Sequence, residues 1–330
     1  MGILAISKES VEQRTGRCNR TGPGICYRLY PKMKMLPLIP EIKRTDLSNC
    51  ILQLTNFGIN IFDCEFLDYP PQSNVLYAIQ FLLKKKLIYL KIKNGNKKYK
   101  IADNCVYIKN KNKGYVKLDV DNKKNSNDAS VSSLLDNIFN LNMKIFITNY
   151  GKIINSLPFD ANLSCFYQDC LSNNVSYYGS MLTAMISLNN YNFIKNCIND
   201  NGKNSGSGSD LEFLINLFEH YLISENKFNF CKEKGISQKF LEKACNIFHK
   251  LNKKKDKNDI LILEKVFSDS FSYNKSIKEK DGSYTHLESK RKVYIHPTSC
   301  YFKKSEKQIV FVDVLCTTKE YIRIVGKYYP

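Results

Sequence analysis

The stretch Gln13-Arg14-Thr15-Gly16-Arg17-Cys18-Asn19-Arg20 is the most informative part of this sequence. Its arginines recur at every third position, so on a helix neighbouring guanidinium groups can reach the same anion. Guanidinium groups match phosphate oxygens in a bidentate geometry, and Gly16 lets a backbone approach closely. The pattern predicts a group that stabilises the charge developing on a transferring γ-phosphoryl. Taken alone, it also fits a basic, solvated helix face.

The flanks of this stretch resemble the end of an α/β domain. Residues 3–6 form a short apolar run, and a helix is expected from about Ser10. A glycine-rich turn at 21–24 leads into Ile25-Cys26-Tyr27-Arg28-Leu29-Tyr30, whose alternation predicts a strand. A strand–helix–strand unit of this size cannot bury its own faces. The segment therefore indicates the remnant of a larger α/β domain.

Residues 36–90 show two helical patterns followed by short strands. Asp46 can cap a helix with apolar positions at Leu47, Cys50, Ile51 and Leu54. Pro70-Pro71 starts a second helix, whose apolar stripe is Val75, Ile79, Leu82 and Leu83. Strand-like runs follow at Leu87–Ile92, Lys98–Ile101, Val106–Ile108 and Tyr115–Val120. This order predicts a winged helix with an enlarged, Asn/Lys-rich wing.

The second half changes from helical to β patterns. Helical periodicity marks Leu163–Leu171, Tyr178–Leu188, Leu211–Tyr221 and Phe240–Leu251. The Ser-Gly-Ser-Gly-Ser run that ends at Ser209 lacks the Lys-Ser/Thr of a phosphate loop, so we interpret it as a flexible linker. From about Phe267 the pattern becomes β, with strands expected at Tyr284–Leu287, Val293–His296, Ile309–Leu315 and Tyr321–Val325. Short strands in this space predict a small β-barrel.

The composition favours a packed protein that binds a polyanion. The 330 residues include 50 Lys+Arg against 31 Asp+Glu, a net charge of +19, and 43% are hydrophobic. The electrostatic field of such a positive net charge attracts nucleic acid, although biased coding composition explains part of the lysine content. The twelve cysteines show no zinc-binding spacing, so we expect no metal site. We find no signal peptide and no membrane-spanning run, and we expect an intracellular protein without a membrane partner.

Gln13–Arg20 resembles motif VI of superfamily-2 helicases, Q-R-x-G-R-x-G-R, in the form found in DEAH-box RNA helicases. Around it, Ile6-Ser7-Lys8-Glu9-Ser10 and Gly22–Tyr30 resemble the family's I-S-K-x-S and G-P-G-x-C-Y-R-L-Y runs. Six further segments resemble family motifs: Ile39–Arg44, Phe66–Pro71, Ile147–Asp160, Asp281–Tyr284, Ile295–Ser299 and Thr317–Arg323. Asn19 departs from the motif, where the family has glycine.

The resemblance implies a multidomain α+β fold with four parts. These are a remnant of the second RecA-like domain at 1–34, a winged helix at 35–155 with a wing insertion at about 94–140, a helical ratchet domain at 156–266 with a flexible linker near 201–209, and an OB-fold at 267–330.

The same resemblance implies roles for particular residues. Gln13, Gly16, Arg17 and Arg20 would face the phosphates of ATP, with Arg17 and Arg20 catalytic, while Arg14 would pair within the domain. Mg²⁺ would be held by the first motor domain, because the sequence contains neither a P-loop nor a D-E-A-H motif.

RNA contacts are expected near the C-terminus, at Lys319, Tyr321 and Arg323. Tyr321 either stacks on a base or faces the barrel interior, and we interpret His296 as a turn residue before proline.

The sequence predicts an ATP-dependent RNA helicase part in the nucleus or nucleolus that couples NTP hydrolysis to RNA unwinding or RNP remodelling. The isolated chain is expected to be inactive as an NTPase. The resemblance also implies RNA and a helicase-activating or RNP partner protein as partners. The alternative is a non-enzymatic RNA- or protein-binding module built from helicase accessory domains. A DNA-binding winged-helix factor fits less well, because it does not explain the ratchet and OB signatures.

Overall fold

The computed structural model describes residues 6–30, 37–94, 97–102, 105–110, 114–117, 142–188, 208–251, 259–302 and 304–330. The chain divides into two compact units, Gly2–Lys152 and Ile153–Pro330. The expected strand at residues 3–6 lies largely outside the described residues, as do most of the expected linker and the far end of the wing. The four-part division stays a prediction.

The first unit begins with a short helix. α1 (Lys8–Gly16) is capped by the Ser7 side chain, which accepts a hydrogen bond from the Ser10 backbone N–H, and a 3-10 turn η1 (Arg17–Asn19) continues it. The expected strand at Ile25–Tyr30 is wrong, because these residues form no regular secondary structure and pair with no described strand. Leu29 is 97% exposed there, so the segment lacks the partner that a strand requires.

Two helices and a sheet complete this unit. Short turns η2 (Glu41–Lys43) and η3 (Ile61–Asp63) flank α2 (Ser48–Asn56), which precedes α3 (Gln72–Lys84). The expected stripe of α3 is buried. On α2, Leu52 is buried in place of the expected Cys50, which is exposed. Asp46 accepts a hydrogen bond from the Ser48 backbone N–H, as expected of a residue near the helix start.

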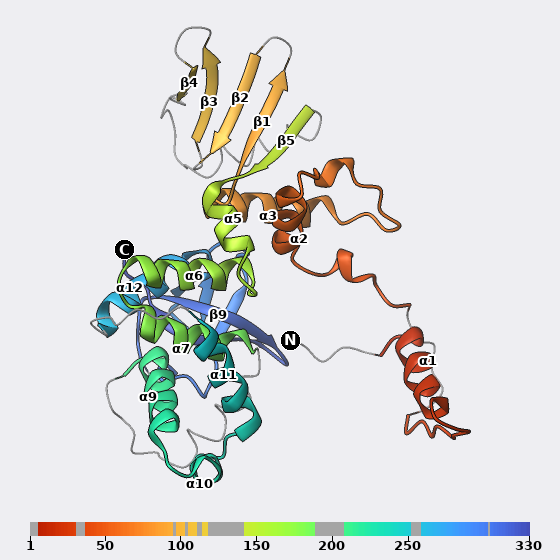
Figure 1. Cartoon of the computed structure of the whole chain (residues 1–330), viewed down its shortest axis with the longest axis vertical. Coiled ribbons are helices and arrows are strands. Elements are labelled where there is room, and N and C mark those ends of the chain that lie inside the picture. Colours follow the sequence, from red (N-terminus) through yellow and green to blue (C-terminus); the bar gives the residue numbers. More distant parts are fainter. Residues whose placement is uncertain are drawn as a thin grey trace. The chain divides into compact units, whose positions relative to one another are not determined.

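The sheet is antiparallel, in the order β4-β3-β2-β1-β5 (Figure 1). Its strands are β1 (Ile88–Asn94), β2 (Lys97–Ala102), β3 (Cys105–Asn110), β4 (Gly114–Lys117) and β5 (Asn142–Ile147). β5, which pairs with β1, was not expected from the sequence. It is followed by α5 (Asn149–Asn155), within which the two units divide.

The second unit joins helices to a barrel around a continuous apolar core. Its helices are α6 (Ala161–Ser172), α7 (Ser176–Ser187), α9 (Asp210–Ile223), α10 (Lys227–Glu233), α11 (Gln238–Lys250) and α12 (Ile260–Ser270). Phe166, Phe218 and Phe267 are fully buried in this core, which also includes Val310 and Ile324 of the barrel. The helices and the barrel are therefore packed as one compact unit.

The barrel is closed in the order β10-β8-β7-β6-β9. It follows η5 (Ser272–Asn274) and consists of β6 (Lys275–Lys278), β7 (Tyr284–His286), β8 (Lys292–Ile295), β9 (Gln308–Cys316) and β10 (Glu320–Lys327). The expected small barrel is confirmed. Its expected start at Phe267 is wrong, because Phe267 is a fully buried residue of α12, whose helical turns pack it against Phe166.

Candidate nucleic-acid interface

Two strands of the barrel bring tyrosine side chains together at its surface. β8 and β10 pair in parallel with Tyr294 beside Tyr321, and their ring centroids are 6.3 Å apart. The His296 ring meets Tyr321 edge-on at 5.6 Å. Both tyrosines are partly exposed, and neither belongs to the barrel's apolar core. Of the two expectations for Tyr321, its position favours a surface ring over an interior one.

A groove of about 450 Å³ opens beside these rings. Its lining combines aromatic, basic and small residues and includes no acidic side chain: Lys278, Gly282, Tyr284, Tyr294, Ile295, Pro297, Phe302, Lys304, Ser305, Lys319 and Tyr321. The Phe302 side chain is 49% exposed, so the groove has a third accessible ring. Aromatic rings beside cations are the means by which proteins hold single-stranded nucleic acid.

The groove lysines are held at defined places. Lys319 Nζ lies 4.6 Å from the centroid of the Tyr294 ring, and Lys278 Nζ donates to Ser305 Oγ at 2.9 Å. Lys304 Nζ donates to the Gly208 backbone carbonyl at 2.7 Å. Neighbouring acids are paired with other cations, Asp281 with Lys292 and Glu320 with Arg291. The lysine charges are therefore not cancelled within the groove.

A buried carboxylate, Asp210, joins α9 to the barrel. Asp210 Oδ2 accepts hydrogen bonds from Ser299 Oγ and from the Val325 backbone N–H, both at 2.8 Å. Asp210 Oδ1 accepts from the Cys300 backbone N–H at 2.6 Å. Burial raises the pKa of the Asp210 carboxyl, while these hydrogen bonds oppose the rise by favouring the charged form. We call this arrangement the Asp210 junction.

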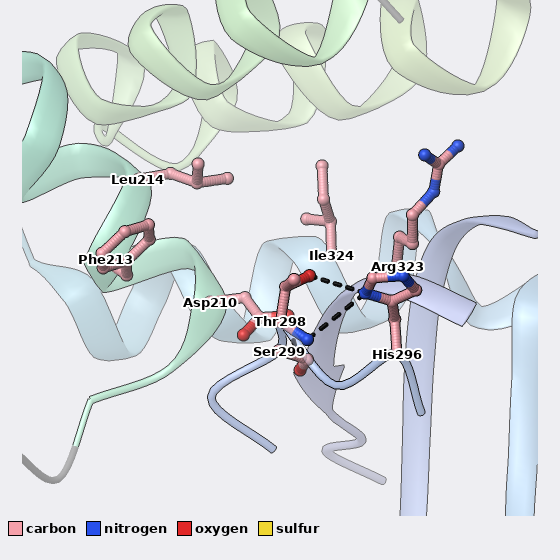
Figure 2. A pocket seen from close by; sticks show the side chains of 8 residues that line it. All are labelled: Asp210, Phe213, Leu214, His296, Thr298, Ser299, Arg323 and Ile324. Carbon is pink, nitrogen blue, oxygen red and sulfur yellow. Dashed lines mark hydrogen bonds between the residues drawn. The ribbon is translucent and has the colours of Figure 1, made fainter. Parts of the chain in front are cut away.

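The Asp210 junction constrains the backbone of β10. Ile324 has a φ of 53°, a left-handed conformation that is strained for a β-branched residue. The next residue, Val325, donates its N–H to Asp210. Figure 2 shows Asp210, Ser299 and Ile324 around a cavity of about 10 Å³, scarcely the volume of one water. The close packing and the carboxylate together fix the β10 backbone that also supports Tyr321.

Arg323 does not join Lys319 and Tyr321 in the groove. Its side chain is 7% exposed and its guanidinium forms an ion pair with Asp313 of β9. In Figure 2 it lies along the wall of the Asp210 cavity. In the register of β10 and β9, Arg323 lies directly opposite Asp313, so its guanidinium meets that carboxylate. In this structure Arg323 therefore forms an ion pair outside the groove, and its expected RNA contact stays a prediction.

The phosphate-facing residues expected from motif VI lie at the end of α1. Gln13, Arg17 and Arg20 are exposed, and a Cβ added to Gly16 would meet no atom within 4 Å. Arg28 Nη2 donates to Thr15 Oγ1 at 3.2 Å, tying the following segment to α1. Arg14 is also exposed. The space beside Gly16 would admit a phosphate group, and contact of these residues with a nucleotide stays a prediction.

Several residues of the interface were missed by sequence reasoning. Tyr294 directly precedes the Ile295–Ser299 motif, and Phe302 follows it by three residues, so interleaved aromatic and basic residues were an available signal. Asp210 follows the N-cap Ser209, whose side chain accepts a hydrogen bond from Glu212 N–H at 3.3 Å. Ser209 is therefore part of a helix start and not of the expected linker. From the sequence alone, Asp210 would be interpreted as a solvent-exposed acid in the first turn of a helix.

The closed five-stranded barrel has the architecture of an OB-fold, and comparison with known proteins agrees. A family model described as an oligonucleotide/oligosaccharide-binding (OB)-fold matches residues 262–327. The match begins within α12, so it includes a helix as well as the five strands. The barrel is an OB-fold.

The whole chain is similar to DEAH-box RNA helicases and matches their C-terminal region. It is 26% identical to the pre-mRNA-splicing factor ATP-dependent RNA helicase DEAH10 of Arabidopsis thaliana, over 98% of this chain and 42% of that protein. It is 24% identical to the pre-mRNA-splicing factor ATP-dependent RNA helicase prp22 of Schizosaccharomyces pombe, over 99% of this chain and 25% of that protein. The resemblance seen in the motifs is confirmed, and the chain spans less than half the length of either relative.

Within the described residues, no helix is long and apolar enough to cross a membrane. The same residues contain no group of three or more His, Cys, Asp and Glu side chains placed to hold a metal ion.

Proposed function

We propose that this chain is the RNA-gripping and coupling portion of an ATP-dependent DEAH-box RNA helicase. The observation that supports this most is the groove of the OB-fold, where Tyr294, Tyr321 and Phe302 lie among Lys278, Lys304 and Lys319. Base stacking on such rings is independent of sequence, and lysines attract the phosphate backbone. A groove of this kind suits a helicase, which has to hold RNA of any sequence while it moves.

The second part of the proposal concerns the residues at the end of α1, which would couple ATP hydrolysis to RNA binding. We propose that Gln13, Gly16, Arg17 and Arg20 face the phosphates of ATP, with Arg17 and Arg20 stabilising charge on the γ-phosphoryl. Their exposed side chains and the open space at Gly16 support this assignment. ATP would come with Mg²⁺, held by the first motor domain of the helicase. The naming of both relatives as splicing factors supports a nuclear RNP as the target and the nucleus as its location.

The alternative function is a non-enzymatic RNA- or protein-binding module. The groove supports this alternative, because its lining residues belong to the OB-fold. RNA binding by these residues would not require ATP. RNA binding by the chain is common to both functions, whereas only the first one makes use of Arg17 and Arg20.

The groove is tested by a double substitution, Lys319→Glu with Tyr321→Ala. Loss of one stacked base costs about 1–3 kcal/mol, so we expect affinity for a fluorescent U12 RNA to fall by about 10-fold or more. The matched control is Phe228→Ala with Lys232→Glu on α10, where Phe228 is 63% exposed and Lys232 is also exposed. Fluorescence polarisation at fixed salt is the measurement. Equal losses in both variants would contradict the groove as the RNA site.

A further inference from the structure

The sheet of the Gly2–Lys152 unit has a second surface with the chemistry of a nucleic-acid platform. β1 and β5 pair with Tyr89 opposite Phe146 and Lys91 opposite Lys144. The rings of Tyr89 and Phe146 stack with centroids 5.4 Å apart and planes inclined by 14°. Lys91 Nζ lies 4.6 Å from the Phe146 ring centroid and 5.6 Å from that of Tyr89. We call this surface, formed by Tyr89, Lys91, Lys144 and Phe146, the Tyr89 face.

The opposite side of the same two strands forms the core of the unit. Ile88, Leu90 and Ile145 are 1%, 0% and 8% exposed. On the Tyr89 face the rings are partly exposed and both lysines are exposed. The apolar residues on that side already form the core, so the core does not require the aromatic pair. Its rings lie at the surface beside two cations.

The backbone pairing continues from β1 through the other three strands. Lys91 pairs with Lys100, Lys100 with Tyr107, and Tyr107 with Lys117. In sequence, these three strands are also rich in lysine and tyrosine. The five strands contain no Asp or Glu.

Lys91 and Lys144 lie directly opposite each other on neighbouring strands, where their positive charges repel. No acidic residue of the five strands offsets this repulsion. A phosphate backbone would relieve the repulsion, and bases could stack on the exposed rings. Stacking needs bases that are not already paired, which favours a single strand over a duplex.

We propose that the Tyr89 face binds single-stranded RNA. The site is separate from the OB-fold groove, because the two lie in different units of the chain. It also goes beyond the proposed function, since it uses neither the groove nor the ATP-facing arginines. Either proposal can therefore fail while the other stands.

The test uses the full chain with its groove already altered by Lys319→Glu and Tyr321→Ala. In this background, Lys91→Glu with Lys144→Glu is expected to weaken binding of fluorescent U12 RNA at least 10-fold. The matched control, Lys232→Glu with Lys250→Glu, makes the same change of charge at exposed lysines of α10 and α11, and should change affinity less than about 2-fold. Circular dichroism melting confirms that both variants are folded.

A salt titration with a milder variant separates a site from a general charge effect. Lys91→Gln with Lys144→Gln should reduce the slope of log affinity against log salt by about 1.4, or about 0.7 for each lost phosphate contact. Competition by unlabelled U12 but not by a 12-base-pair RNA duplex or by anionic vesicles is also expected. Equal losses in the control variant, an unchanged slope, or equal competition by duplex or vesicles would overturn the proposal.

Discussion

The end of α1 and the Asp210 junction differ in the burial of their key residues. The first is proposed to contact ATP, and the second holds α9 against the barrel that contains the proposed RNA groove. At the end of α1, the residues with the clearest motif, Gln13 to Arg20, are mostly exposed, and Val11 is the one described residue of α1 that is buried. At the Asp210 junction, a residue without a recognised motif is buried and accepts three hydrogen bonds from the barrel. The most recognisable residues of the chain are thus not those that hold its structure.

The difference follows from what each residue contacts. An arginine that meets a phosphate only when the nucleotide is bound has to remain accessible, so it adds little to stability. A carboxylate that joins two elements has to be buried and fully hydrogen-bonded, because an unsatisfied group there would be costly. Three variants, at two buried positions and at motif VI, test how burial relates to stability, in order of expected effect.

Asp210→Ala is expected to give the largest effect. It leaves the Cys300 and Val325 backbone N–H groups without their acceptor inside the protein, at a cost of about 1–3 kcal/mol each. We expect a total loss of about 3–5 kcal/mol in the free energy of unfolding, measured by urea denaturation. Glu212→Ala, in the same helical turn but partly exposed, is the control. A loss for Asp210→Ala no larger than that of the control would refute the Asp210 junction.

An intermediate effect is expected at His286, which is 8% exposed in β7. Burial lowers the pKa of this imidazole below its ordinary 6.5. The folded state therefore favours the neutral ring, and its stabilising contribution is complete above pH 6.5 and is lost as the pH falls below it. Between pH 7.5 and 5.5 stability should fall by less than about 1.4 kcal/mol per pH unit, the limit for one proton.

The measurement at His286 is the thermal midpoint as a function of pH. His286→Gln should flatten the profile over this range, whereas His249→Gln, at an exposed position of α11, should leave it unchanged. A profile that keeps its slope in the His286→Gln variant would rule out this ring as its source.

The smallest effect on stability is expected at motif VI. Arg17→Ala with Arg20→Ala removes exposed side chains, so the thermal midpoint should shift by less than about 2 °C. The chain by itself should show no RNA-stimulated ATP hydrolysis before or after the change. Hydrolysis by the unaltered chain that disappears in the variant would mean that the chain holds a complete nucleotide site.

Some features could be predicted because local chemistry determines them. The stripe Val75, Ile79, Leu82 and Leu83 is buried as its spacing indicates, since one face of an amphipathic helix has to be covered. The short β runs after residue 280 form strands, because turns such as Asp281-Gly282 separate them. Gly282 has a φ of 83°, which glycine adopts without strain.

Other expectations failed where a residue's partner is distant in sequence. Ile25–Tyr30 has the alternation of a strand but lacks a described strand to pair with. β5 was missed because it lies far along the chain from β1, with which it pairs. Phe267 was assigned to the β region by its neighbours, yet it is buried in α12 against Phe166.

The sequence by itself determined the relationship to DEAH-box helicases, the positions of the arginines in motif VI and the presence of a C-terminal barrel. These depend on motifs and on spacing along the chain. Only the tertiary structure decided that Arg323 pairs with Asp313, that Tyr294 joins Tyr321 in the groove, and that Asp210 joins α9 to the barrel. Each of these depends on burial and on partners brought together by folding, which no local pattern records.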